Sequence, residues 1–192
     1  MQVCLPNKAE TWIQASNKVE MIQDGKIIIG IDPDVDQSGI GRLDVMERKC
    51  TATHLPFPLL IDYVRDVAQV ARMRGREIVV YVEASWMSSH NWHLKTWDSK
   101  AVAAKKGEGV GRMHETGRKI VEMLQHYGID VREQHPLKKC WKGKDGKITH
   151  EELTQICGWD KKRSNQEERD AMLIAYYESG LPIRILTTKT KK

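Results

Sequence analysis

Two apolar runs, each closed by an acidic residue, constrain the fold of this chain more than any other feature. Residues 26–32 (KIIIGID) and 77–83 (EIVVYVE) are apolar and rich in β-branched residues between their charged ends. Continuous runs of this kind are typical of strands that are buried on both faces of a sheet. They predict two central strands that end at Asp32 and Glu83.

Weaker patterns place further elements around these two strands. Residues 39–47, 50–55 and 129–133 are predicted as strands. Apolar residues at helical spacing predict helices over residues 59–74, 112–127, 149–156 and 164–179. In the last helix, Ser164 and Glu167 have the spacing of a capping box. Together these elements predict an α/β fold with a mixed five-stranded sheet flanked by helices.

The remaining segments define the expected domain organisation. Residues 1–25 form a short amphipathic extension, residues 26–179 the folded domain, and residues 180–192 a basic tail. Within the domain, residues 85–111 are rich in Ser, Lys, Trp and Gly and have the least regular pattern. We interpret them as a functional loop, in which the Gly-x-Gly-x-Gly pattern of residues 107–111 is a flexible hinge.

The net charge of +5 is concentrated in the middle of the chain. Residues 84–163 contain 16 Lys and Arg against 10 Asp and Glu, a net charge of +6, whereas residues 1–83 have a net charge of −2. Four of the six tryptophans are interleaved with these cations. Lysines attract phosphates and exposed aromatic rings stack on unpaired bases, so the pattern favours nucleic-acid binding. A solvated loop with core tryptophans would give the same pattern.

Four carboxylates form the candidate site. Asp32 and Glu83 end neighbouring strands, and open α/β sheets carry their functional groups at the carboxyl ends of strands. Glu167 and Asp170 lie one turn apart on the last helix; Glu168 is the alternative to Glu167, whose side chain the capping box would occupy. Converging carboxylates repel one another unless a cation lies among them, and oxygen ligands suit Mg²⁺, with Mn²⁺ as a substitute.

These residues resemble the motifs of the RuvC family of Holliday-junction resolvases, which have the RNase H fold. The family's first strand ends in a pattern similar to residues 29–33 (IGIDP), followed here by Ser38-Gly39. Its second acid has an aromatic residue three positions on, as Glu83 has Trp86, and its last helix resembles residues 167–175 (EERDAMLIA). One departure is Asp34, which stands where the family has Gly and, with Asp36, adds negative charge beside the site.

The resemblance implies an RNase H-like endonuclease that cuts four-way or other branched DNA, uses Mg²⁺ and acts as a homodimer. Its metal ligands and catalytic acids would be Asp32, Glu83, Glu167 and Asp170. Trp86 would act at the junction centre. Lys138, matched on spacing, would contact the scissile strand and assist catalysis. Lys142, Lys147 and Arg112 would be further DNA contacts in the basic region. A phage or mobile-element variant of the family would fit the departures.

Alternatives remain at this stage. A nuclease of the same fold could act on RNA–DNA hybrids, and a non-catalytic junction-binding protein could use the same acids structurally. A sugar-kinase-like ATPase would need a longer chain with a duplicated domain. The chain has no apolar run near the roughly 18 residues that span a bilayer, no signal peptide and no C-x-x-C pair. We therefore expect a cytoplasmic protein, from a bacterium or a phage-infected cell, with reduced thiols and no membrane association.

Overall fold

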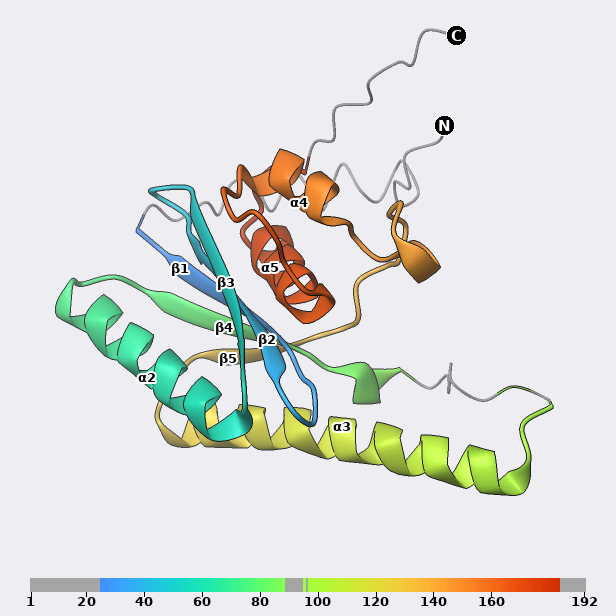
Figure 1. Ribbon diagram of the computed structural model, residues 1–192. Helices are drawn as coiled ribbons and strands as arrows, with labels where there is room; N and C mark the ends of the chain where they lie inside the picture. Colours follow the sequence, from blue (N-terminus) through green and yellow to red (C-terminus); the bar gives the residue numbers. More distant parts are fainter. Residues whose placement is uncertain (1–24, 89–94, 96, 184–192) are drawn as a thin grey trace, which may run out of the picture.

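The two apolar runs form neighbouring central strands of a five-stranded sheet (Figure 1). The computed structural model describes residues 25–88, 95 and 97–183. Its strands are β1 (Ile27–Asp32), β2 (Ser38–Asp44), β3 (Lys49–Leu55), β4 (Ile78–Glu83) and β5 (Val131–Gln134). They lie in the order β3-β2-β1-β4-β5, in which β1, β4 and β5 are parallel and β2 is antiparallel to both of its neighbours. This arrangement confirms the expected α/β fold with a mixed five-stranded sheet.

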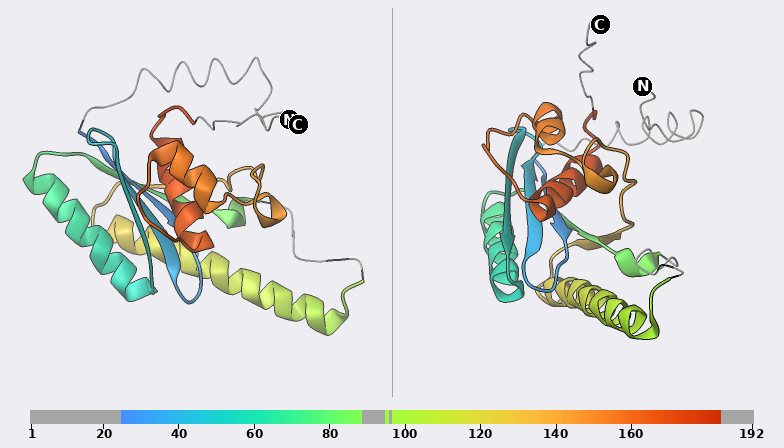
Figure 2. Two further views of the ribbon diagram at one scale, coloured as in Figure 1. Left: turned by 45° about the horizontal axis from the view of Figure 1, so that its top comes forward. Right: turned by 45° about the vertical axis from the view of Figure 1, so that its right-hand side comes forward.

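Helices cover both faces of this sheet (Figure 2). They are α2 (Phe57–Met73), α3 (Lys100–His126), α4 (His150–Cys157) and α5 (Gln166–Glu178), with short 3-10 turns η1 (Ser85–Met87) and η2 (Lys144–Gly146). The core under α2 and α3 includes Ile29 and Ile31, whereas the core under α4 and α5 includes Ile28. Alternate residues of β1 thus enter opposite cores, as expected for a strand buried on both faces.

Helix α5 lies unusually close to the sheet because glycines line its path. Gly30 and Gly41 are paired across β1 and β2, and Gly39 is paired with Asp32. A Cβ atom at Gly39 would overlap the backbone of Glu167, and one at Gly30 or Gly41 would overlap the backbone further along α5. Any larger residue at these positions would push the helix outward, so the glycines determine where its acids lie.

The expected loop over residues 85–111 is wrong from Lys100 onward, because α3 begins there and is a single helix to His126. The side chain of Ser99 caps it by accepting a hydrogen bond from the backbone N–H of Val102. Alanine and lysine dominate the first two turns, and their helix propensity outweighs the glycines, each of which costs about 1 kcal/mol relative to alanine. Residues 107–111 are therefore helix interior and not a hinge.

The predicted capping box of the last helix is also wrong. Helix α5 starts at Gln166, and the side chain of Asn165 accepts a hydrogen bond from the backbone N–H of Glu168 (2.8 Å). The spacing of Ser164 and Glu167 imitated a cap one residue too early. Glu167 is consequently not held in a capping box and stays available to the candidate site.

The other predicted boundaries lie within three residues of those in the structure. Residues 1–24 of the extension and residues 184–192 of the tail lie outside the described residues. Within the part that is described, none of the helices is long and apolar enough to cross a membrane.

An ion pair between Arg76 and Asp44 lies at the end of the sheet opposite the carboxyl end of β1. Arg76 donates from Nη1 and Nη2 to the two carboxylate oxygens of Asp44 (2.5 and 2.7 Å) and from Nε to the carbonyl oxygen of Gly25 (2.9 Å). These hydrogen bonds lower the pKa of Asp44 below its ordinary value. Three directed bonds from one planar group hold the start of β1 against the end of β2.

Replacing Gly39 by alanine should destabilise the protein by about 2 kcal/mol, because the new methyl group must displace the backbone of α5. Gly107→Ala is the matched control. It lies within α3, where an added methyl group would meet no neighbouring atom, and it should stabilise the protein by up to about 1 kcal/mol. Urea unfolding followed by circular dichroism measures both changes. Equal effects of the two substitutions would contradict the close packing of α5.

Candidate active site

Asp32 and Glu83 end adjacent parallel strands at the same edge of the sheet. Ile31 is paired in register with Val82, so the two acids occupy the next position on each strand. Both side chains are half-buried. Their proximity follows directly from the parallel pairing of β1 with β4, and the sequence pattern predicted it correctly.

Helix α5 brings two further acids to this edge. Asp170 is half-buried, and its charge raises the pKa of both Asp32 and Glu83. Glu167, whose backbone lies over Gly39, also raises the pKa of Asp32, by a smaller amount. The structure thus brings together acids from β1, β4 and α5.

Burial and mutual repulsion shift the titration of these acids. Burial raises the pKa of Asp32 well above its ordinary range, and the charges of Glu83 and Asp170 raise it further. Burial, with the charge of Asp170, raises the pKa of Glu83 to about 7. Burial also raises the pKa of Asp170, although neighbouring donors and cations oppose the shift. Each of these acids is harder to ionise than it would be in water.

Two lysines counter this negative charge. The Nζ atom of Lys147 lies 3.7 Å from Oδ2 of Asp170, and Lys147 lowers the pKa of Asp32, Glu83 and Asp170. Lys139 lowers the pKa of Glu83 and Asp170 as well. The sequence pattern selected Lys138, which is exposed on the same segment, and missed Lys139 because spacing alone does not distinguish two adjacent lysines.

Gln166 and Arg169 are site residues that the motifs did not indicate. Gln166 donates from Nε2 to Oδ1 of Asp170 (2.7 Å), and Arg169 donates from Nη2 to Oε1 of Gln166 (2.7 Å). Arg169 lies between the two acids of the helix motif, and Gln166 directly precedes the first of them. Their contacts depend on how α5 meets the preceding loops, which the motif itself does not specify.

Glu168, the alternative to Glu167, has a different environment. It is buried, with one carboxylate oxygen 2.7 Å from Nζ of Lys161 and the other 3.0 Å from Nδ1 of His54. Although burial opposes it, hydrogen bonds from these partners lower the pKa of Glu168 below its ordinary value. Glu168 therefore joins α5 to β3 and is already paired, which favours Glu167 as the site residue.

Trp86 follows Glu83 in η1 and is half-buried against the core under α2 and α3. Its ring contacts the backbone of α3 at Gly117, where an added Cβ would overlap it, and lies edge-on to His114 at 6.4 Å between ring centres. The guanidinium of Arg118 lies 5.6 Å from the ring centre. These contacts give Trp86 a packing role, while part of the ring stays accessible.

The remaining predicted DNA contacts are exposed cations. Arg112 lies on α3, and Lys138 and Lys142 lie on the segment that leads to α4. The backbone N–H of Lys142 donates to the buried carboxylate of Glu152, which fixes this segment against α4 and leaves the lysine side chain outside. In the described part of the chain, none of these three cations forms an ion pair with a candidate acid, and the cations that lower the pKa values of the acids are Lys147, Lys139 and, for Asp170, Arg169.

The donor chemistry of the acids fits a hard divalent cation. Asp32, Glu83, Asp170 and Glu167 are oxygen donors, and a bound cation would reverse the raised pKa values among them. Among the described residues, however, no three His, Cys, Asp or Glu side chains are arranged to coordinate one ion. Both carboxylate oxygens of Asp170 have partners, since Oδ1 accepts from Gln166 and Oδ2 lies 3.7 Å from Nζ of Lys147.

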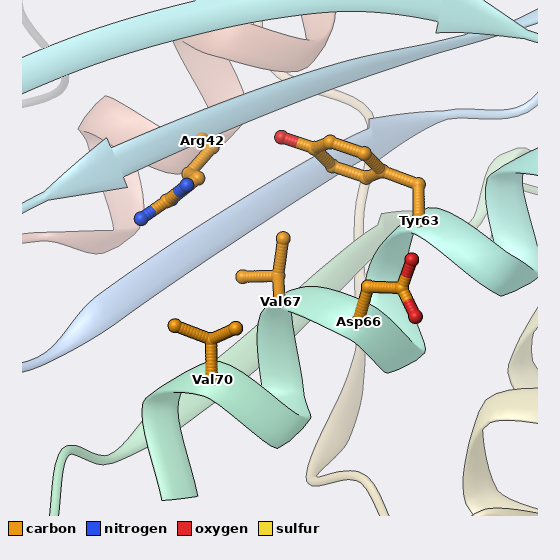
Figure 3. A pocket seen from close by; sticks show the side chains of 5 residues that line it. All are labelled: Arg42, Tyr63, Asp66, Val67 and Val70. Carbon is orange, nitrogen blue, oxygen red and sulfur yellow. The ribbon is translucent and has the colours of Figure 1, made fainter. Parts of the chain in front are cut away.

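An open pocket lies between β2 and α2, on the face of the sheet opposite to α5 (Figure 3). Its lining residues are Arg42, Tyr63, Asp66, Val67 and Val70. None of the candidate acids lines it. The pocket is therefore not part of the candidate site.

Comparisons with known proteins give a likeness at the level of solved structures. No protein-family model and no curated protein matches the chain. The chain is similar to Thermus thermophilus RuvC in complex with a Holliday junction substrate, with 17% identity over 79% of this chain and 90% of that chain, and a TM-score of 0.41. It is also similar to a second Thermus thermophilus RuvC structure, with 20% identity over 78% and 91% of the two chains and a TM-score of 0.37. Likeness at this level does not define an activity.

Glu83→Gln should stabilise the metal-free protein at pH 8 by about 2 kcal/mol. Because the pKa of Glu83 is about 7 in the folded state and lower in the unfolded state, folding stability falls as the pH rises through this interval. In the glutamine variant, the part of this decrease in stability that comes from the ionisation of Glu83 should be absent. Urea unfolding in EDTA at pH 5.5 and pH 8 measures the difference. An unchanged pH dependence in the variant would show that Glu83 is not electrostatically strained.

Proposed function

We propose that this chain is a metal-dependent endodeoxyribonuclease that cleaves branched DNA, with four-way junctions as its main substrate. The observation that carries the proposal is the convergence of Asp32, Glu83 and Asp170 from three elements at one edge of the sheet. Their charges disfavour one another, so the arrangement weakens the fold unless a cation joins it. Strain of this kind is characteristic of functional sites.

Asp32, Glu83, Asp170 and Glu167 would hold Mg²⁺, with Mn²⁺ able to replace it. When bound, such an ion lowers the pKa of a coordinated water and neutralises charge that develops on a phosphate under attack. Binding requires ionised carboxylates, and the pKa of Glu83 near 7 places its ionisation close to neutral pH. The affinity of the metal-free protein for Mg²⁺ should therefore rise with pH through this region.

The cations beside the acids would make the site compatible with DNA. Four carboxylates alone would repel a phosphodiester, whereas Lys147 and Lys139 place positive charge next to Asp170 and Glu83. Lys138 is exposed and would contact the scissile strand, as its match on spacing implies. Lys142 and Arg112 are also exposed and would contact phosphates farther from the scissile bond. Loss of one of these exposed residues should weaken binding more than it slows the chemical step.

Cleavage of a four-way junction on two strands would need two such sites, and a homodimer would provide them. The same experiment tests two alternatives. One is a nuclease that acts on RNA–DNA hybrids. The other is a non-catalytic junction-binding protein, which the engaged oxygens of Asp170 would favour. Labelled four-way junction, flap, linear duplex and RNA–DNA hybrid, each incubated with Mg²⁺ and with Mn²⁺, separate the three. Absence of product from every substrate would rule out the nuclease.

Asp32→Asn should lower the rate of junction cleavage by about 100-fold or more, since even indirect partners of a metal are worth about 10–100-fold. Junction affinity, measured by gel shift in Ca²⁺, should change little. The control is Asp62→Asn on α2, an exposed acid whose only described ion pair is with Arg65, one turn along the same helix. Cleavage retained in Asp32→Asn would exclude the proposed metal centre.

Trp86→Ala tests whether this residue contributes to the junction or to packing. The contacts with α3 predict a loss of about 3 kcal/mol in the free energy of unfolding. If Trp86 also acts at the junction centre, fluorescence measurements of junction opening should be impaired more than binding of a linear duplex. Equal losses for the two DNA forms would assign Trp86 to packing alone.

A further inference from the structure

Arg169 joins three segments that meet beside the candidate acids. Its Nε atom donates to the carbonyl oxygen of Ile148 (3.0 Å), which directly follows Lys147. Its Nη1 atom donates to the carbonyl oxygen and the hydroxyl of Ser164 (2.6 and 3.2 Å), in the loop before α5. Its Nη2 atom donates to Gln166, at the start of α5 (2.7 Å). A planar guanidinium can make these bonds at once, whereas an ammonium cannot reproduce their directions.

The bond to Ile148 determines where Lys147 lies. Lys147 leaves the 3-10 turn η2 in extended conformation and carries the ammonium group that approaches Asp170 to 3.7 Å. Ile148 itself is buried in the core under α4 and α5, so its carbonyl group is a fixed point between loop and helix. Because Arg169 on α5 holds this carbonyl group, the ammonium of Lys147 stays beside Asp170.

The bond to Gln166 determines how Asp170 is presented. Gln166 uses its carbonyl oxygen to accept from Arg169 and its amide nitrogen to donate to Oδ1 of Asp170. The accepted bond therefore fixes which end of the amide faces the acid. Oδ1 of Asp170 is thereby held on the helix side, while Oδ2 is directed toward Lys147.

We infer that Arg169 is a positioning residue of the site: through Ile148 it holds Lys147, and through Gln166 it orients Asp170. This role rests on the proposed function, because it concerns the geometry with which Asp170 would receive a cation. Arg169 does not itself contact substrate or metal in this assignment. It resembles the hydrogen-bonding partners that fix ligand side chains around metal ions, which typically contribute about 10–100-fold to affinity or rate.

Arg169→Lys retains the charge and removes the fork of hydrogen bonds. Mn²⁺ binding, followed by calorimetry or electron paramagnetic resonance, should weaken about tenfold. The kcat for junction cleavage at saturating Mg²⁺ should fall by a similar factor, while KM for the junction should stay within about twofold. Gln166→Met is a second variant that removes the hydrogen bonds of Gln166 with Asp170 and with Arg169 but leaves the other bonds of Arg169 in place. It should shift Mn²⁺ affinity in the same direction with little effect on folding.

Arg76→Lys is the matched control, because the guanidinium of Arg76 makes three directed hydrogen bonds, compared with four from Arg169, and lies at the opposite end of the sheet. It should lower stability as much as Arg169→Lys does, yet leave Mn²⁺ affinity and kcat unchanged. If Arg169→Lys and Gln166→Met bind Mn²⁺ like the wild type, or if Arg76→Lys weakens binding equally, the positioning role is wrong. A wild-type protein that neither binds Mn²⁺ nor cleaves DNA would instead overturn the proposed function, and this role with it.

Discussion

The contact between the backbone of α5 and the glycines of β1 and β2 is the constraint on which the site depends. Gly30, Gly39 and Gly41 allow the helix to approach the sheet more closely than any side chain would permit. At this distance the first turns of α5 lie beside the ends of β1 and β4. Acids that are remote in sequence then share one desolvated edge, and the helix cannot withdraw without leaving a void above the strands.

Two acids in the first turns of α5, Glu168 and Asp170, have opposite electrostatic environments. Glu168 is buried but paired with Lys161 and His54, and its pKa is lowered despite the burial. Asp170 is partly neutralised by Lys147 and Gln166, but its pKa remains raised. The pairing of Glu168 with His54 stabilises the contact between α5 and β3. The charge of Asp170, in contrast, repels that of Asp32 at the end of β1. The charge of Glu168 is thus compensated within the fold, whereas that of Asp170 is compensated only in part.

The sequence predicted those parts of the site that depend on pattern and topology. Asp32 and Glu83 could be placed together because buried apolar strands have few alternative partners and parallel neighbours end at one edge. The N-terminal half of α3 was missed since its glycines resemble a loop, although alanine, lysine and the Ser99 cap outweigh them. Arg169 and Gln166 could not be predicted, because their partners come from segments joined only in the folded chain.

Helix α3 has a consequence for how the molecule loses its structure. All of its buried residues lie from Gly117 onward, and Figure 1 shows the helix running past the sheet before that point. Residues 100–112 are thus held by local propensity, the Ser99 cap and an ion pair of Lys106 with Asp98, without a share in either core. Amide exchange along this single helix will have two tiers: the outer turns open on their own, and the inner turns exchange only when the sheet itself comes apart.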